Sequence, residues 1–517
     1  MLRRSRALLP LFMAALALSG AARAQSNRLI PLDDPAYRYI ERLQRRGRLL
    51  ELHPTALPYR YGEVAAALRS VDRGALSPVE AAWVAQLDAR FRERPLSPDE
   101  AVLGVQLGGG GSAANTRRLD GLRPLGKEAH AFENVFAQVF VEKGPFVAQL
   151  GARHDLYYHR DPDGLDAVRR LAARSEESYA GAHTPFASVY LGRFANHWGL
   201  PGGPGVVLSD NPRSYDQLNL RLGGPRLSLR SLLGELDSIT ADGRYTGIAG
   251  DDSVRASERR FFAAHRFDWR PTPNLVLSLM ESAIYSGGNS GVSLKYLNPA
   301  NPFFFVVDNR PKNDENNGAV AGLIWLHAGR LTLHGQLMFD DFDVLNGQEP
   351  ASFAMTGSLV YAARPDVDLG GGLDVVAART YNTIQPEGRF VYLLRGLATQ
   401  FSDYVHAHAF ADLYLVPGLT LTPRLDVLAQ GERDIRQPFP AKDSDVPTIL
   451  TGAVERTVRT SARLFFQRDP RWWIRLDLGV NVTKNKGAVE GADETRFVGL
   501  AAFGVRLTFD RNFKLRF

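Results

Sequence analysis

The last twenty-one positions of the chain, 497–517, alternate between apolar and polar side chains. From Arg506 onward every even position is polar. Nearly all odd positions are apolar, namely Phe497, Ala501, Phe503, Val505, Leu507, Phe509, Phe513, Leu515 and Phe517. Because successive side chains of a strand point to opposite faces, this pattern predicts a strand with one apolar and one polar face. Such a strand at the end of a chain is typical of a transmembrane β-barrel.

The first residues contain the three parts of a secretory signal peptide in order. A basic start with arginines is followed by the apolar stretch 7–18 and by the cleavage site Ala22-Arg23-Ala24. We therefore expect residues 1–24 to be removed and the mature chain to begin near Gln25. Because this removes four arginines and no acid, the formal net charge falls from +6 to +2. The high pI is therefore no indication of a nucleic-acid partner.

The rest of the chain divides into two parts with different patterns. Residues 25–98 have helical spacing, as in the segment 83–91, which follows a capping box that begins at Ser77. Residues 99–517 consist of period-two segments separated alternately by short turns and long polar loops, which is typical of outer-membrane barrels with long loops outside the cell. No segment after the signal offers the about 20 consecutive apolar residues of a membrane helix. We predict a periplasmic helical bundle at 25–98 and an outer-membrane β-barrel at 99–517.

The segment from Leu331 to Phe339 predicts which strand face meets lipid. Its odd positions form an apolar row, whereas Thr332, His334 and Gln336 are expected to face the barrel interior. Aromatic residues beside turns, such as Trp325, are expected in an interfacial girdle.

The same alternation gives a strand count. Clear segments number about 16, and the total must be even because both ends of a barrel of this kind lie in the periplasm. An even number of strands must be inserted between 146–157 and 217–222, and Ala187–Phe194 and Gly205–Ser209 supply two. About 18 strands is the preferred count, and 16 or 20 remain possible because 389–398 reads either as loop or as strand.

Two groups of motifs extend this interpretation. The first consists of Tyr39-Ile40-Glu41-Arg42-Leu43, Gly47 and Leu57-Pro58-Tyr59, and the second of Gly192-Arg193-Phe194, Trp198-Gly199, Gly202-Gly203 and Val207-Leu208-Ser209-Asp210-Asn211. Together with the layout of helical bundle, barrel and terminal aromatic residue, they resemble the Wzi-type capsule assembly outer-membrane proteins. The resemblance implies a plugged barrel of about 18 strands that binds capsular polysaccharide and holds it on the cell surface without catalysis.

Carbohydrate binding requires aromatic faces for stacking and planar polar side chains for pairing with hydroxyl groups. The long loops contain both kinds of side chain. The candidate carbohydrate-binding residues are Tyr157, Tyr158, Arg160, Tyr285, Tyr296, Asp308, Arg310 and Tyr381. The alternative interpretation is that they are girdle aromatics and solvated loop charges.

A second set of residues is expected inside the barrel. The loop 286–315 is too apolar for a hydrated loop, so we expect it to fold into the lumen as a plug. Charged residues in or beside strands with an apolar row should also face the lumen. The candidate lumen and plug residues are Arg193, Trp198, Glu281 and Asp340. They would form a salt-bridged network or, alternatively, line a porin-type channel.

The sequence does not indicate an enzyme, a metal site or a cofactor. The chain has no cysteine and no G-x-S-x-G motif, and His197 and His265 each stand without a recognisable serine partner. His406 and His408 share a strand face, but a third metal ligand is not evident.

The sequence as a whole predicts a surface receptor in the outer membrane of a Gram-negative bacterium. Its expected partners are capsular or exported polysaccharide, outer-membrane lipid, the barrel assembly machinery during biogenesis and polysaccharide export proteins, with no nucleic acid. We expect a monomer. The alternative is a porin or solute channel, and an enzyme acting on lipid or glycan is a third interpretation.

Overall fold

The computed structural model describes residues 26–92, 100–164, 173–239, 259–287, 291–303, 315–341, 352–383, 386–436 and 447–514. The expected signal peptide and the terminal Phe517 lie outside the described residues.

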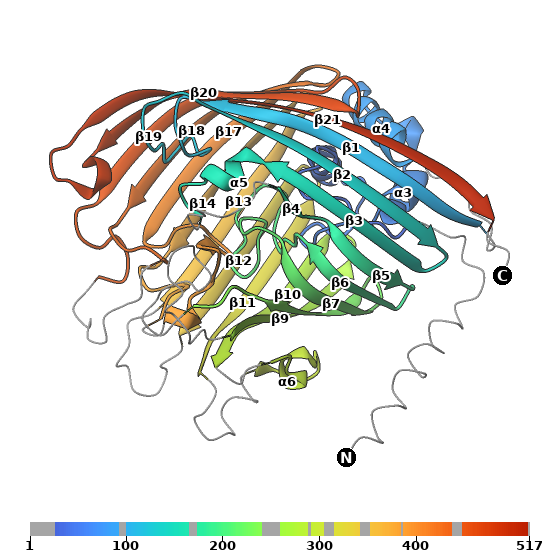
Figure 1. The fold of residues 1–517 in the computed structure, drawn as a ribbon. Helices are drawn as coiled ribbons and strands as arrows, with labels where there is room; N and C mark the ends of the chain where they lie inside the picture. Colours follow the sequence, from blue (N-terminus) through green and yellow to red (C-terminus); the bar gives the residue numbers. More distant parts are fainter. Residues whose placement is uncertain are drawn as a thin grey trace.

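A single closed sheet forms the wall of the molecule (Figure 1). Each strand pairs antiparallel with its neighbours, and the last strand pairs with the first from Glu100↔Lys514 to Ala114↔Leu500. The strands are β1 (Glu100–Ala114), β2 (His130–Lys143), β3 (Phe146–Asp155), β4 (Ala173–Ser175), β5 (Ser178–His183), β6 (Ala187–Phe194), β7 (Tyr215–Gly223), β8 (Leu227–Glu235), β9 (Arg259–Thr272), β10 (Leu275–Gly287), β11 (Glu315–Ala328), β12 (Leu331–Asp341), β13 (Ser352–Arg364), β14 (Val367–Val376), β17 (Tyr404–Val416), β18 (Leu419–Gln430), β19 (Glu455–Phe466), β20 (Trp472–Lys484) and β21 (Glu494–Lys514).

The predicted count of 18 is confirmed. The sheet has 19 strands, but the short β4 and β5 lie one after the other along β3 and share one position, which gives an 18-strand barrel. One predicted strand is wrong, because Gly205–Ser209 is a loop and Ser178–His183 supplies the missing strand. The segment 389–398 contributes no barrel strand and contains a small hairpin of β15 (Val391–Tyr392) and β16 (Arg395–Gly396).

The side-chain alternation follows the predicted faces. In β12, Thr332, His334 and Gln336 are buried, while Leu331, Leu337 and Phe339 are exposed on the outside. In β21 the exposed apolar residues are Phe497, Phe503, Val505, Leu507 and Phe509. Trp325 does not belong to an outer girdle, because it is buried in the core inside the barrel.

Two inner loops, 195–214 and the described parts 377–383 and 386–403 of a second one, pack against each other and against the inward faces of the strands. Val206, Val207 and Leu208 of the first loop belong to the same buried cluster as Phe390 and Leu397 of the second. The Ser209 amide donates a hydrogen bond to the Leu397 carbonyl at 2.9 Å. The apolar composition of 205–209 therefore predicts a strand, but the segment forms a loop. Its side chains are buried because their hydrophobic partners lie inside the barrel.

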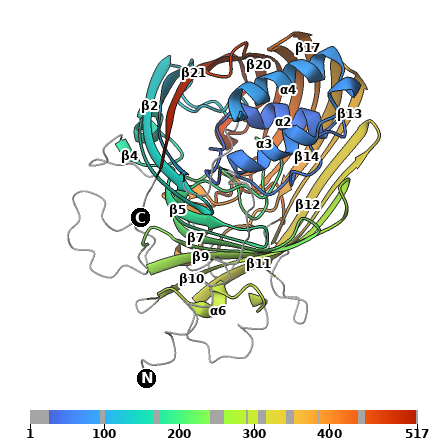
Figure 2. The same cartoon turned by 90° about the vertical axis from the view of Figure 1, so that its right-hand side faces the viewer.

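The helices α2 (Ala36–Gln44), α3 (Tyr61–Ser70) and α4 (Pro78–Phe91) lie together at the end of the barrel where the short turns are, as Figure 2 shows from that side. The predicted capping box begins α4: Ser77 Oγ accepts from the Glu80 amide, and the Glu80 carboxylate accepts from the Ser77 amide. The Trp83 ring packs edge-on against Tyr414 of β17, with centroids 4.7 Å apart. Within the described ranges, no helix has the length and apolar composition needed to cross a bilayer.

Ion pairs also hold the helical bundle to the barrel. Arg46, which follows α2, pairs with Asp368 at the start of β14, with a 2.7 Å contact to a carboxylate with no exposed side-chain surface. Arg506 of β21 contacts both Asp33 and Asp34, which precede α2.

Candidate functional site

The short helix α5 (Leu156–Arg160) presents three of the predicted carbohydrate-binding residues at the long-loop end of the barrel. It begins after β3, where the Asp155 carboxylate accepts a hydrogen bond from the Tyr157 amide at 3.0 Å. Arg160 is exposed, whereas Tyr157 and Tyr158 are half-buried. The Tyr157 ring packs edge-on against Phe132 of β2. The helix α5 therefore lies at the surface of the long-loop end. Its two tyrosines are partly packed against the barrel, and the side chain of Arg160 is exposed.

Directly after α5, the Asp161 carboxylate joins this helix to the second inner loop. Arg395 donates two hydrogen bonds to the two oxygens of Asp161, each at 2.7 Å. Arg213 of the first inner loop approaches the same carboxylate at 3.4 Å, and its guanidinium lies 4.9 Å from the centre of the Tyr158 ring. The Asp161 side chain is 3% exposed. Three segments far apart in the sequence are thus tied to one buried charge.

A second carboxylate two residues later repeats this arrangement. Asp163 accepts two hydrogen bonds from Arg118 of the β1–β2 loop, at 2.7 and 2.8 Å. Arg436, which follows β18, lies 3.7 Å from Asp163. We call α5 with Asp161, Asp163 and the arginines 118, 213, 395 and 436 the arginine–aspartate cluster. Bidentate arginine–carboxylate pairs fix geometry as well as charge, so the cluster gives the loop surface a defined shape.

The surroundings of two tyrosines and one arginine of the cluster shift their pKa values. Burial raises the pKa of Tyr158 to about 12 and also raises the pKa of Tyr157, so both phenols remain hydrogen-bond donors. Burial alone would lower the pKa of Arg395, but the charge of Asp161 outweighs it and raises that pKa. Arg395 also donates to the Asn211 side chain, whose amide in turn donates to Gln400. The surface thus offers guanidinium, phenol and amide groups, the types that pair with sugar hydroxyls.

The other predicted carbohydrate-binding residues do not join this cluster. Tyr381 is buried in the interior, where its hydroxyl donates to the Val206 carbonyl at 2.7 Å. Tyr285 and Tyr296 stack on each other at 4.3 Å and are also buried. In this arrangement none of the three rings offers a free face to a polymer. Asp308 and Arg310 lie outside the described residues.

The loop expected as a plug lies on the other side of the wall. The helix α6 (Leu294–Leu297) carries Tyr296, which packs with Phe303 on Leu233, Phe261 and Ala283. These strand residues share their faces with Leu227, Phe267 and Leu279, which are exposed on the outside of the barrel. The expectation that this loop folds into the lumen is therefore wrong for residues 291–303. The apolar composition requires burial, and the outer wall provides it.

Of the four predicted lumen residues, two lie inside the barrel and two lie on its outer face. Trp198 and Asp340 lie inside, Trp198 in the central cluster and Asp340 as acceptor for the Tyr381 amide. Glu281 is corrected to the outer face, because it lies two positions from the exposed Leu279 in β10 and so shares its face. Arg193 is corrected likewise: it shares the face of the exposed Leu191. Its charge is balanced there by Asp216 of the neighbouring strand.

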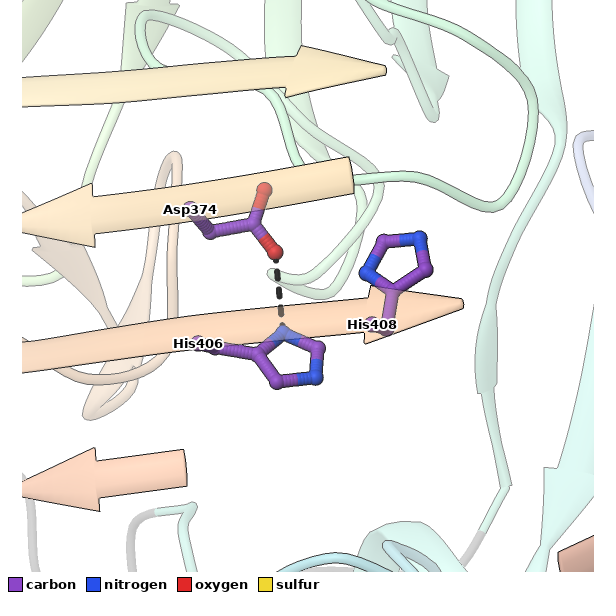
Figure 3. Close-up of side chains that lie close together, drawn as sticks. All are labelled: Asp374, His406 and His408. Atoms are coloured by element: carbon purple, nitrogen blue, oxygen red, sulfur yellow. Dashed lines mark hydrogen bonds and ion pairs between the residues drawn. The ribbon is translucent and has the colours of Figure 1, made fainter. Parts of the chain in front are cut away.

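Inside the barrel, three side chains that could ligate a metal lie together (Figure 3). Asp374 of β14 is the third group missing from the sequence analysis of His406 and His408. Their candidate ligand atoms lie within 4.8 Å of one another. Both ring nitrogens of His406 already contact carboxylates, Nδ1 that of Asp374 at 3.0 Å and Nε2 that of Asp426 at 2.9 Å. A metal ion would have to replace one of these contacts, so the arrangement is that of an ion-paired histidine.

Most of the arginine–aspartate cluster could not be predicted from the sequence. Arg118, Asp163, Arg213 and Arg395 come from four loops, and no local spacing connects them. Only the pair Asp161 and Asp163 beside an aromatic helix could have drawn attention to them.

Comparisons with known proteins place the fold. No protein-family model matches the chain, and no curated protein sequence matches it. Among solved structures, the chain is similar to Wzi of Escherichia coli, an outer membrane protein involved in group 1 capsule assembly that is a carbohydrate-binding β-barrel. The two are 12% identical, with a TM-score of 0.60, over 93% of this chain and 99% of Wzi. Weaker likenesses, with TM-scores of 0.42 and 0.43, are to OccK11 and OprD of Pseudomonas aeruginosa, at 12% and 11% identity over 79% of this chain and 96% and 95% of theirs.

Proposed function

We propose that this chain, whose fold is that of the capsule assembly barrel Wzi, binds exported or capsular polysaccharide at the long-loop end and attaches it to the cell surface without catalysis. The observation that carries the proposal is the arginine–aspartate cluster, which gives that end of a Wzi-type barrel a rigid polar surface. Rigid, preorganised polar groups lose little conformational entropy when they bind a flexible polymer.

A closed lumen suits this function better than a channel. The two inner loops meet in a cluster that also contains inward residues of the wall, among them Phe262, Met280 and Met338. Arg260 of β9 donates hydrogen bonds to the carbonyls of Glu387 and Val391, which ties the second inner loop to the wall. These contacts support a plug. The alternative, a porin or solute channel, predicts a stable ion conductance in planar bilayers, and a conductance comparable to that of an open porin would refute the plug.

The same proposal orients the molecule. Short turns of outer-membrane barrels lie in the periplasm and long loops outside the cell. The helical bundle at 26–92 contacts the short-turn end through Arg46–Asp368 and Trp83–Tyr414, which supports a periplasmic location for it. There it is available to polysaccharide export proteins, while the barrel itself is a monomer in outer-membrane lipid, inserted by the barrel assembly machinery.

The test measures binding of the purified protein to the polysaccharide extracted from the surface of its own host, by titration calorimetry. Arg160→Ala removes an exposed guanidinium from the proposed surface and leaves the buried pairs intact. A hydrogen bond to a charged group contributes about 1.5–3 kcal/mol, so the Kd should rise about tenfold or more. Arg471→Ala is the matched control, because Arg471 is exposed in the β19–β20 turn at the opposite end. Equal Kd values for wild type and Arg160→Ala would contradict this placement of the binding surface, and no binding by wild type would contradict the function.

A further inference from the structure

Three polar side chains lie in one row across the outer wall. Ser231 of β8 is paired directly with His265 of β9, and His265 is paired directly with Glu281 of β10. The adjacent row toward the short turns consists of Leu229, Phe267 and Leu279 in the same register, and Phe267 and Leu279 are 42% and 60% exposed. Strand alternation therefore places the serine, the histidine and the glutamate on the face that meets lipid.

Hydrogen bonds order two of these groups. His265 Nδ1 lies 2.9 Å from one carboxylate oxygen of Glu281, and the other oxygen accepts from the Phe303 amide at 2.8 Å. His265 Nε2 is buried and has no hydrogen-bond partner among the described residues. A carboxylate that accepts from Nδ1 leaves Nε2 as the basic nitrogen of the ring. The free nitrogen thus belongs to the histidine directly opposite Ser231.

The segment around α6 covers this row. The Phe303 ring lies over His265 with centroids 4.3 Å apart, and Ser231 Oγ donates a hydrogen bond to the Leu297 carbonyl at 2.9 Å. Ser231 and His265 are 1% and 4% exposed beneath this cover. Placing ionisable groups on a membrane-facing surface costs free energy. The covering segment does not need them, because apolar contacts such as those of Tyr296 also hold it on the wall. The polar row therefore calls for a chemical role.

We propose that Ser231, His265 and Glu281 form a second site, a latent serine esterase on the outer wall that cleaves carboxylic esters of membrane lipids when α6 lifts. Ser231 Oγ attacks the ester carbonyl and its proton passes to His265 Nε2. The tetrahedral intermediate then collapses, the ester C–O bond breaks, and the histidine gives that proton to the departing alcohol. Water, deprotonated by His265, cleaves the acyl-serine, releases a fatty acid and returns the proton to Ser231. Glu281 holds the ring orientation and stabilises the imidazolium throughout.

The location fits the substrate class. The row lies one step beyond lipid-facing Phe267 and Leu279, near the middle of its three strands. The charged pair of Glu235 and Arg259 lies further along the same face toward the long loops. A lipid that lies against this wall can therefore bring an ester of its acyl chain to Ser231.

The experiment labels the refolded full-length mature protein in detergent with a biotinylated alkyl fluorophosphonate and maps the modified residue by mass spectrometry. We expect labelling at Ser231, increased in Phe303→Ala, which removes the ring over His265 but keeps the amide that Glu281 binds. Ser231→Ala and His265→Ala should abolish it, and Glu281→Gln should lower the labelling rate at least 100-fold, since replacing the acid of a triad costs up to about 10⁴-fold. Ser282→Ala is the matched control, because Ser282 directly follows Glu281 in β10 but faces the barrel interior.

The same variants are assayed for release of fatty acid from phosphatidylethanolamine vesicles, and heat-modifiable gel mobility confirms that each barrel is folded. Release by Phe303→Ala that is lost in Phe303→Ala/Ser231→Ala supports the proposal. Absence of Ser231 labelling in folded wild type and folded Phe303→Ala would overturn it. So would labelling that persists in His265→Ala or Glu281→Gln, because the row would then be structural.

Discussion

The arginine–aspartate cluster predicts the consequence of removing one guanidinium. In Arg395→Gln, the Asp161 carboxylate loses two hydrogen bonds of 2.7 Å while its side chain remains almost fully buried. Breaking a buried ion pair by removing one partner costs about 3–5 kcal/mol. Arg213 stays within 3.4 Å, and Arg395 is 14% exposed, so the lower end of that range, about 3 kcal/mol, applies here. In Arg395→Gln/Asp161→Asn the unpaired carboxylate is gone and Arg213 keeps its hydrogen bond to the Tyr158 carbonyl, so the cost should fall to about 1 kcal/mol.

The rate of tryptic cleavage measures this cost, because trypsin cleaves after arginine and Arg160, the last residue of α5, directly precedes Asp161. Cleavage after Arg160 requires local opening, and its rate follows the open population when closing is fast. Since 1.4 kcal/mol corresponds to a tenfold change, Arg395→Gln should speed cleavage about 100-fold and the double variant about fivefold. Arg471→Gln, at the opposite end, should leave the rate unchanged. A double variant that is cleaved as fast as Arg395→Gln would refute the reasoning, because the penalty would then not come from an unpaired carboxylate.

Three further predictions concern the bundle and the wall. Burial alone would raise the pKa of Asp34, but Arg90 and Arg506 outweigh it and lower that pKa to about 2. The ion pairs of Asp34 should therefore stabilise the docked bundle fully above pH about 4 and lose this effect as the pH falls through about 2. Asp34→Asn should remove that pH dependence from the protection of α2 against pepsin, which is active in this pH range. Trp83→Ala should destabilise the docked bundle by about 3–5 kcal/mol, seen as a lower guanidinium midpoint of bundle proteolysis; an unchanged midpoint would contradict the packing on Tyr414. Leu279→Arg should cost about 2–4 kcal/mol in denaturant unfolding from lipid vesicles, and no cost would place Leu279 away from lipid.

Much of the barrel could be predicted from the sequence because strand period is a local property. The alternation in 331–339 and 497–509 identifies the outer face residue by residue, and the structure follows it. The strand Ser178–His183 could not be predicted, because alanine and glycine in its centre give little difference in polarity between its two faces. The prediction of a strand at Gly205–Ser209 is wrong, because its valines and leucine are apolar but belong to a loop that packs inside the barrel.

The sites depend on contacts between distant segments, which spacing does not reveal. Asp161 meets Arg395 across 234 positions, and Glu281 meets His265 through strand register. Composition did predict that the segment around Tyr296 is buried, but it contains no information about which side of the wall it covers.

The measurement that tests the polysaccharide-binding account most directly is the distribution of surface polysaccharide after deletion of the gene. Cell-bound and released polysaccharide are quantified separately in the deletion strain and in strains complemented with wild type or Arg160→Ala. We predict that deletion moves polysaccharide into the medium with its total amount unchanged, that wild type restores retention, and that Arg160→Ala restores less of it at equal protein level. Unchanged retention of cell-bound polysaccharide in the deletion strain would contradict the account.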